Sequence, residues 1–252
     1  GNVAKHGNRS VSGVSGSADI FEYFGFDLSS KPWIVEESIE KIGIGFMFAP
    51  TFHPAMKNVA PARKLIGKRT AFNLLGPLCN PAKVRHQMIG VFADKYIERI
   101  VRIMQKNFSD TVLAVRSDDG MDELSTTSKN KACLLKNEEI TEFIIDPSKY
   151  NMEKGNLSNI QISTKQEAID AFAKGLNNTS NKTMKEITIL NAAGGLLVGG
   201  ICDRFDEGVE LALETINNGN AFKKLKQFTK ENNALDKLEE FEWYGKYFRK
   251  TC

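Results

Sequence analysis

Cations, hydroxyls and glycines are concentrated in residues 5–19, which read KHGNRSVSGVSGSAD. Glycines let backbone N–H groups turn toward an anion with no Cβ in the way, and serine hydroxyls add further donors. Lys5 and Arg9 place positive charge near those donors. The apolar residues that follow predict a short helix that starts near Ser17 and ends at Gly25, and its N-terminal dipole favours an anion. The stretch can therefore hold phosphate, although Gly/Ser-rich composition alone is typical of a flexible loop.

A second candidate for chemistry is the acidic run DDGMDE at residues 118–123. Asp122 and Glu123 offer the hard oxygen ligands that Mg²⁺ prefers, with room left for water and substrate phosphates. An adjacent acid pair after a glycine is more often the solvated start of a helix. This pair, however, follows a predicted strand at 111–115, and ligands in open α/β sheets lie off the carboxyl ends of the strands. The residues alone therefore make Asp122 and Glu123 candidate ligands for a hard cation.

Two supersecondary patterns indicate how these segments are positioned. Residues 88–93, 96–108 and 111–115 alternate as apolar run, amphipathic helix and apolar run, which predicts a βαβ unit. Residues 132–135 and 140–144 predict a hairpin that extends the sheet. A further strand is expected at 44–48, and helices are expected at 34–42, 55–66, 165–174, 184–198, 205–216 and 221–228. The predicted fold class is α/β, with a central, mainly parallel sheet flanked by helices.

Composition excludes some classes of protein. The chain has 252 residues, of which 41% are hydrophobic and 26% charged, as is ordinary for a folded domain. The net charge of +3 is small and the lysines are scattered among acids, so a nucleic-acid partner is not expected. There is no apolar run near the roughly 18 residues of a membrane span. We expect a cytoplasmic protein without a membrane partner.

One domain is the economical prediction, because no internal repeat or low-complexity linker is evident. Residues 1–233 form this predicted α/β domain. Residues 234–252 mix acids with aromatics and are expected to be an extra helix packed on the body or a tail.

The order of motifs resembles that of the anthranilate phosphoribosyltransferase family. The matching stretches are KHGNR-x-x-S-x-x-SGSAD from residue 5, FAP and HPAMK at 48–57, NLLGPL with NP at 73–81, and DGMDE at 119–123. The resemblance runs to about residue 233. It implies a fold like the nucleoside phosphorylases and phosphoribosyltransferases. It also implies transfer of the phosphoribosyl group from phosphoribosyl pyrophosphate to anthranilate, the second step of tryptophan biosynthesis.

The resemblance also implies a set of site residues and Mg²⁺ as the cofactor. It carries the magnesium role to Asp122 and Glu123, and no covalent nucleophile is required. The residues that it assigns to phosphoribosyl pyrophosphate are Lys5, His6, Gly7, Asn8, Arg9, Ser10, Val11, Ser12, Gly13 and Ala18. The residues that it assigns to anthranilate are Asn8, His6, Arg63 and Pro77, with the Arg63 guanidinium suited to the carboxylate. His53 is interpreted as a hydrogen-bonded structural residue.

The sequence departs from the family pattern at its start. Members of the family carry an N-terminal helical domain and a GTGGD loop that grips the phosphoribosyl pyrophosphate, and neither precedes the KHGNR motif here. We therefore expect a C-terminal part of a longer enzyme, inactive by itself. Family members usually form homodimers through the helical domain.

Two alternatives remain at this stage. Pyrimidine nucleoside phosphorylase shares the fold and handles ribosyl and phosphate groups, but its signature differs from KHGNR and lacks the Asp-Glu pair. Relatives of the same fold that bind nucleic acid should show a basic groove and steeply salt-dependent binding. Phosphorolysis of thymidine would favour the first alternative, and binding to DNA without a magnesium effect would favour the second.

Overall fold

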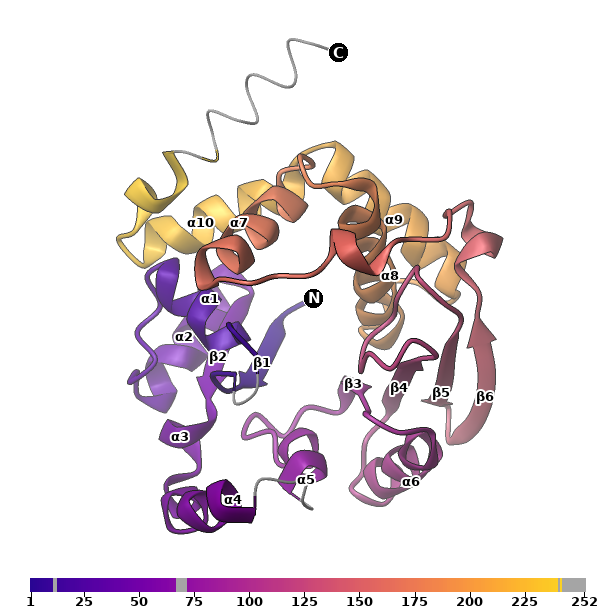
Figure 1. Cartoon of the computed structure of the whole chain (residues 1–252). Helices are drawn as coiled ribbons and strands as arrows, with labels where there is room; N and C mark the ends of the chain where they lie inside the picture. Colours follow the sequence, from indigo (N-terminus) through magenta and orange to yellow (C-terminus); the bar gives the residue numbers. More distant parts are fainter. Residues whose placement is uncertain (11–12, 67–71, 240, 242–252) are drawn as a thin grey trace, which may run out of the picture. The chain divides into compact units, whose positions relative to one another are not determined.

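The structure is a computed structural model that describes residues 1–10, 13–66, 72–239 and 241 (Figure 1). Its strands are β1 (Val3–Gly7), β2 (Ile44–Phe48), β3 (His86–Gly90), β4 (Thr111–Ser117), β5 (Asn130–Lys136) and β6 (Glu139–Ile145). Its α-helices are α1 (Ser17–Tyr23), α2 (Pro32–Ile42), α3 (Ala49–Phe52), α4 (Ala60–Ile66), α5 (Phe72–Leu78), α6 (Ile97–Lys106), α7 (Lys165–Leu176), α8 (Lys182–Val198), α9 (Phe205–Asn217) and α10 (Asn220–Glu231). Short 3₁₀ helices span Pro54–Asn58, Asp94–Tyr96, Pro147–Tyr150, Leu157–Asn159 and Leu235–Leu238. The elements fall into two units, described separately below.

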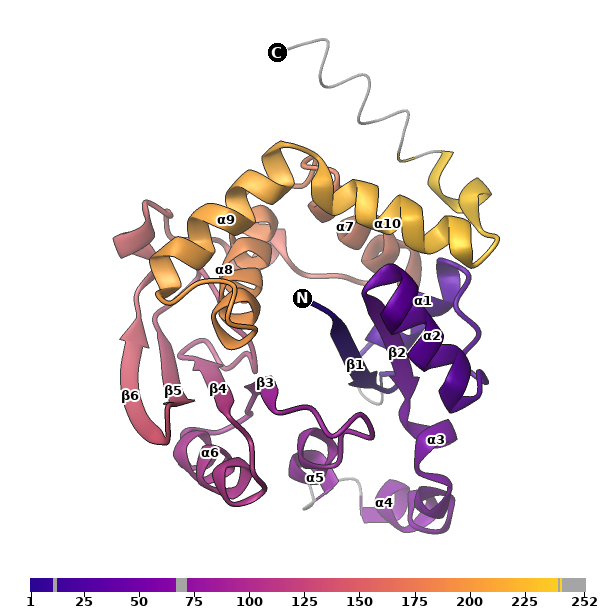
Figure 2. The ribbon, with the colours of Figure 1, turned by 180° about the vertical axis from the view of Figure 1, so that it is seen from behind.

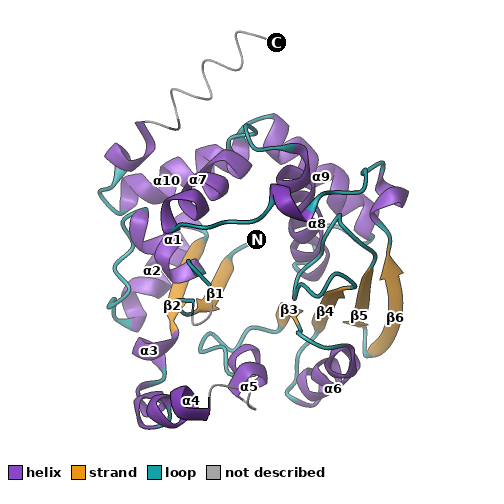
Figure 3. Ribbon diagram, viewed as in Figure 1, coloured by secondary structure: helices purple, strands orange, loops and turns teal. Residues whose placement is uncertain are grey.

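The second unit, residues 84–161 and 174–221, is built on the sheet β3-β4-β5-β6 (Figure 3). The predicted βαβ unit is confirmed, because β3 pairs with β4 in parallel and α6 connects them. The predicted hairpin is also confirmed, with a tight turn at Asn137 and Glu138, which both have positive φ.

The α/β fold class is confirmed, but the expectation of a mainly parallel sheet needs correction. In the second unit only β3 and β4 pair in parallel, whereas β5 runs antiparallel to both β4 and β6. The physical reason is that parallel pairing needs a crossover, usually a helix, and no helix lies in the described residues between β4 and β5. The turn between β5 and β6 is only two residues long and can join only antiparallel strands.

Helices pack on both faces of β4, all of whose residues except the half-buried Arg116 are buried. Leu113 and Val115 belong to the core cluster that includes residues of α8 and α9. Because side chains alternate along a strand, Val112 and Ala114 point to the other face, where α6 contacts β4 and β5. The expectation that the later helices cover the sheet is thus met in this unit by α8, with α9 lying against it (Figure 2).

The first unit comprises residues 1–83, 162–173 and 222–252. Its two strands pair in parallel, with His6 beside Met47. Phenylalanines from α1, β2 and α10 pack together: the Phe21 ring stacks on Phe46 at 4.6 Å, and Phe228 meets Phe21 edge-on at 5.4 Å. This aromatic cluster anchors the segment that follows β1.

Most expected helices of this unit are present, but that at 55–66 is interrupted. A 3₁₀ helix (Pro54–Asn58) is followed by the separate helix α4. The reason is Pro61, which has no N–H to bond a carbonyl of the preceding turn and is tolerated only near a helix start. A glycine often ends a helix, and the one that follows the expected helix, Gly67, lies outside the described residues.

At the other end of the chain, Leu238 and Phe241 are buried in the first unit. The division at residue 233 and the role of 234–252 stay predictions. No helix in the described ranges has the length and apolar character needed to cross a bilayer.

Candidate functional site

The predicted metal pair lies in the turn that follows β4. Asp122 and Glu123 are both exposed. The Asp122 backbone packs against Gly90, the last residue of β3, so closely that a Cβ at Gly90 would lie 1.6 Å from the Asp122 carbonyl oxygen. The pair therefore stands at the carboxyl ends of two neighbouring parallel strands, as predicted.

Hydrogen bonds within the turn fix the backbone before the pair. The Met121 N–H donates to the Asp119 carboxylate at 3.0 Å, and the Met121 carbonyl accepts from the Ser117 N–H at 3.0 Å. Thr127 donates its hydroxyl to the other oxygen of Asp119. Burial raises the pKa of Asp119, but these hydrogen bonds outweigh it and hold that pKa below its usual value. Asp119 thus acts inside the turn, and it is not one of the two predicted ligands.

The donor set at this turn fits magnesium shared with a substrate. Among the residues that the structure describes, no three His, Cys, Asp or Glu side chains gather so as to hold a metal ion by themselves. Two adjacent carboxylates on an exposed turn leave most of an octahedral shell to water and phosphate oxygens, which is how Mg²⁺ is commonly bound.

The predicted phosphate segment begins where β1 ends. Gly7 is required there, because a Cβ at this position would lie 2.7 Å from Ser17 Oγ and 3.1 Å from the Phe46 ring. Lys5 and Asn8 are exposed. Ala18, in contrast, is fully buried, so its side chain cannot meet a ligand at the surface and only its backbone could contribute.

Arg9 is engaged with helix α1. Its guanidinium donates to both carboxylate oxygens of Glu22, at 2.8 and 2.6 Å, and to Asp19 at 2.8 Å. Lys165 of α7 binds the same Asp19 carboxylate at 3.1 Å. Burial raises the pKa of Asp19, but a hydrogen bond from the Gly16 N–H and the charges of Lys165 and Arg9 lower it below its usual value. Arg9, which the sequence analysis assigns to phosphate, therefore has its side chain paired with carboxylates of the protein itself.

Two glycine N–H groups of the segment also have acceptors in the protein. The Gly13 N–H donates to Ser10 Oγ at 2.7 Å, and the Gly16 N–H donates to Asp19 at 2.9 Å. The N–H of Gly16, the residue before α1, is thus bonded to an acid of the helix itself, which the sequence prediction overlooked. Val11 and Ser12, predicted to bind the same substrate, lie outside the described residues.

Two histidines from different motifs meet in the first unit. The rings of His6 and His53 are 5.0 Å apart, edge to face, and the Nε2 atom of each is buried with no hydrogen-bond partner among the described residues. His6 also hydrogen-bonds to the Gly76 backbone. Burial and the nearby His53 ring lower the pKa of His6. His6 therefore lies close to Gly76, which directly precedes the predicted acceptor residue Pro77. Sequence reasoning missed that His53 is a neighbour of His6.

The remaining predicted acceptor residue is Arg63. Its backbone lies in α4, but its side chain is outside the described part of the structure. Its assignment to anthranilate stays a prediction.

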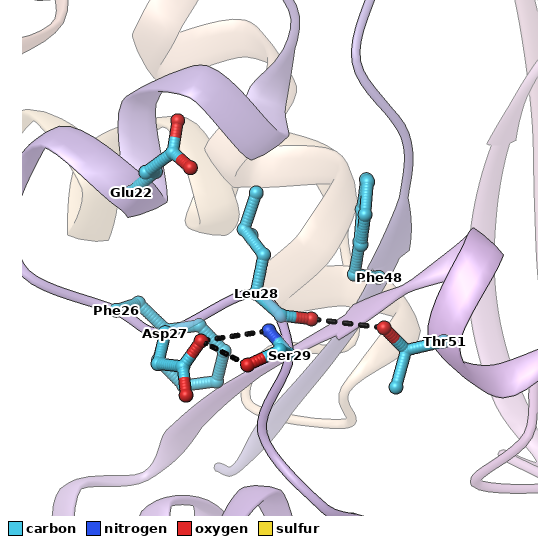
Figure 4. A pocket seen from close by; sticks show the side chains of 7 residues that line it. All are labelled: Glu22, Phe26, Asp27, Leu28, Ser29, Phe48 and Thr51. Atoms are coloured by element: carbon cyan, nitrogen blue, oxygen red, sulfur yellow. Dashed lines mark hydrogen bonds between the residues drawn. The ribbon is translucent and has the colours of Figure 1, made fainter.

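A hollow of about 400 Å³ opens beside α1 in the first unit (Figure 4). It is lined by Glu22, Phe26, Asp27, Leu28, Ser29, Phe48 and Thr51. Its acids are engaged, Asp27 by the N–H and hydroxyl of Ser29 and Glu22 by Arg9, and Thr51 donates to the Leu28 carbonyl at 3.0 Å. Acidic groups disfavour a phosphate, so this hollow is not the predicted donor site.

The motifs and the α/β architecture define a glycosyl transferase. The sequence pattern of the glycosyl transferase family, a/b domain, matches residues 1–222. An anthranilate phosphoribosyltransferase of Nitrosopumilus maritimus is 54% identical over 240 residues, which cover 95% of this chain and 69% of that protein. The chain belongs to the anthranilate phosphoribosyltransferase family.

Solved structures agree with this assignment. The crystal structure of the anthranilate phosphoribosyltransferase from Thermus thermophilus matches with a TM-score of 0.83 and 32% identity, covering 92% of this chain and 69% of that chain. The enzyme of Saccharomyces cerevisiae, solved in complex with phosphoribosyl pyrophosphate and Mg, shares the fold with a TM-score of 0.79 at 24% identity. That match covers 93% of this chain and 66% of the yeast chain.

Proposed function

We propose that this chain carries the magnesium pair and part of the substrate sites for phosphoribosyl transfer from phosphoribosyl pyrophosphate to anthranilate. In this reaction the anthranilate nitrogen forms a bond to C1 of the ribose, the bond from C1 to pyrophosphate breaks, and the nitrogen loses a proton. The observation that carries the proposal is the 54% identity to an anthranilate phosphoribosyltransferase over 95% of the chain.

The donor is assigned to two segments. We propose that Lys5, Asn8 and the hydroxyls after β1 bind the phosphates, and that Asp122 and Glu123 hold Mg²⁺. When bound, Mg²⁺ would neutralise charge on the departing pyrophosphate. Because the Arg9 side chain is engaged with α1, it contributes by holding the segment in place, and only its backbone is left to meet the ligand.

The acceptor is assigned to the first unit. We propose that Arg63 binds the anthranilate carboxylate bidentately and that His6, Asn8 and Pro77 line the ring, with His53 added by its contact to His6. A lowered pKa keeps His6 neutral near pH 7, so it does not repel a cationic centre developing at the ribose.

The test uses a chimaera in which the part of the Nitrosopumilus maritimus relative ahead of the residue that aligns with Gly1 is joined to Gly1. We expect the chimaera to consume anthranilate, seen as loss of its fluorescence, only when phosphoribosyl pyrophosphate and Mg²⁺ are both present. We expect the 252-residue chain alone to be inactive, because the family resemblance assigns part of the donor grip to a GTGGD loop that is not in its sequence. A folded chimaera that leaves anthranilate unchanged but phosphorolyses thymidine would refute the proposal.

A further inference from the structure

Leu124, the residue after the metal pair, is held by a side chain of α8. Asn191 Oδ1 accepts a hydrogen bond from the Leu124 N–H at 3.0 Å, and Asn191 Nδ2 donates to the Leu124 carbonyl at 2.7 Å. The same Nδ2 donates to the Ile187 carbonyl at 2.9 Å, one turn back in α8. One carboxamide therefore pairs with both backbone groups of Leu124, and both of its N–H hydrogens are used.

Asp122 and Glu123 consequently lie between two residues, Met121 and Leu124, whose backbones are held by hydrogen bonds. Leu124 is fully buried in the core cluster with Leu190 and Ala193 of α8. On the other side, Met121 is bonded through its N–H and its carbonyl. Only Asp122 and Glu123 lie between these anchors, so the anchors determine where the two carboxylates stand.

We propose that Asn191 is a positioning residue for the metal pair, acting through Leu124. This inference rests on the proposed magnesium role of Asp122 and Glu123. A metal ligand on a turn binds well only if its backbone is already in place, and groups outside the ligand set supply that constraint. Asn191 supplies it from a helix 67 residues away in the sequence.

Asn191→Ala removes the two hydrogen bonds between the Asn191 carboxamide and Leu124, which we call the clamp. Thr188→Ala is the matched control. Thr188 lies in the same helix and donates its hydroxyl to the Met184 carbonyl at 2.8 Å, with no hydrogen bond to the turn. Asn191→Ser is a second variant, because a serine can still satisfy the Ile187 carbonyl but cannot reach both backbone groups of Leu124. It serves if Asn191→Ala does not fold.

The first measurement is hydrogen exchange of the Leu124 amide by NMR in the 252-residue chain. We expect exchange about tenfold faster in the Asn191 variants, because they lose the acceptor of that N–H, and no change in Thr188→Ala. An unchanged Leu124 amide in a folded Asn191 variant would overturn the inference.

The second measurement is a Mn²⁺ titration, since Mn²⁺ takes the same oxygen ligands as Mg²⁺ and broadens nearby amide signals. In the wild-type chain the amides of residues 120–124 should broaden, and the Asn191 variants should bind about tenfold more weakly. A loss of global stability alone does not change the affinity of the folded state. If wild type binds at the turn and Asn191→Ala binds equally well, the positioning role is wrong while the metal assignment stands. If wild type shows no broadening there, the metal assignment itself fails, and this inference fails with it.

Discussion

Two regions differ in what holds them in place: the turn with the proposed metal ligands, residues 118–124 (the metal turn), and the segment predicted to bind phosphate, residues 5–19 (the phosphate segment). Next to the exposed pair Asp122 and Glu123, Ser125 and Asn130 have no exposed surface, and the Ser125 N–H donates to Asn130 at 2.7 Å. In the phosphate segment the support comes from ion pairs of Arg9, whose side chain is 43% exposed. A site for a small cation needs carboxylates on a fixed backbone, whereas a segment that receives a larger anion needs backbone N–H groups and exposed side chains that face it.

The largest effect is expected from the metal pair. In the active chimaera, Asp122→Asn combined with Glu123→Gln should lower kcat by more than the roughly 10- to 100-fold that loss of an outer support costs. High Mg²⁺ should restore part of the rate, because the change weakens metal binding. Rates measured across a magnesium series check this, and an unchanged magnesium dependence would remove the metal assignment.

Arg63→Ala should affect only the acceptor. A charge-assisted hydrogen bond contributes about 1.5–3 kcal/mol, so kcat/KM for anthranilate should fall about ten- to a hundredfold in the chimaera. The KM for phosphoribosyl pyrophosphate should stay nearly constant. Arg63→Lys should recover part of the loss, since it keeps the charge without the planar fork. Equal losses for both substrates would mean that Arg63 has a structural role instead.

Substituting alanine for one glycine in each region tests which of the two regions is more rigid. Gly90→Ala places a Cβ 1.6 Å from the Asp122 carbonyl, so the metal turn must move, and we expect a loss of about 3 kcal/mol in the free energy of unfolding. At Gly13 the nearest atom is Ser10 Oγ at 2.9 Å, the end of a flexible side chain, so Gly13→Ala should change stability by less than about 0.5 kcal/mol. Denaturant unfolding of both variants tests this. Similar losses would contradict the comparison.

The smallest effect concerns pH and the Arg9 ion pairs. The pKa of Asp19 is lowered in the folded state, so its contribution to stability is present above its unfolded pKa near about 3.9 and is lost as the pH falls below that value. Asp19→Asn should therefore cost about 1.5–3 kcal/mol at pH 7 and little in strong acid. Glu22→Gln, on the exposed side of the same guanidinium, should cost less than about 1 kcal/mol. Denaturant unfolding of both variants at pH 7 and in acid tests this. A loss for Asp19→Asn that is independent of pH would show that the pair is not electrostatic.

Local patterns predicted most of the fold. The buried residues of α6, at Ile97, Ile100, Val101 and Met104, follow the helical period, and a tight two-residue turn defines the β5–β6 hairpin. The sheet order was harder to predict, because periodicity does not determine the direction of a strand that follows a long turn.

The candidate site could be proposed from the sequence only where one motif contains the chemistry. Residues 5–13 and the acid pair are contiguous in sequence, so their order alone indicated them. The contact of His6 with His53 depends on the parallel pairing of β1 with β2, and the clamp of Asn191 on Leu124 joins residues 67 apart. Such long-range contacts have no signature in a single sequence. The motif likewise indicated Arg9 but not that its side chain pairs with Asp19 and Glu22 of α1.

Phosphoribosyl transfer to anthranilate can be followed in the chimaera by a ³¹P NMR time course, with the loss of anthranilate measured by its fluorescence. With phosphoribosyl pyrophosphate, anthranilate and Mg²⁺, we expect one pyrophosphate to be released for each anthranilate consumed, and no pyrophosphate or phosphoribosylanthranilate to form without the metal. Pyrophosphate released with no loss of anthranilate, or no reaction in a folded chimaera, would contradict the proposed function.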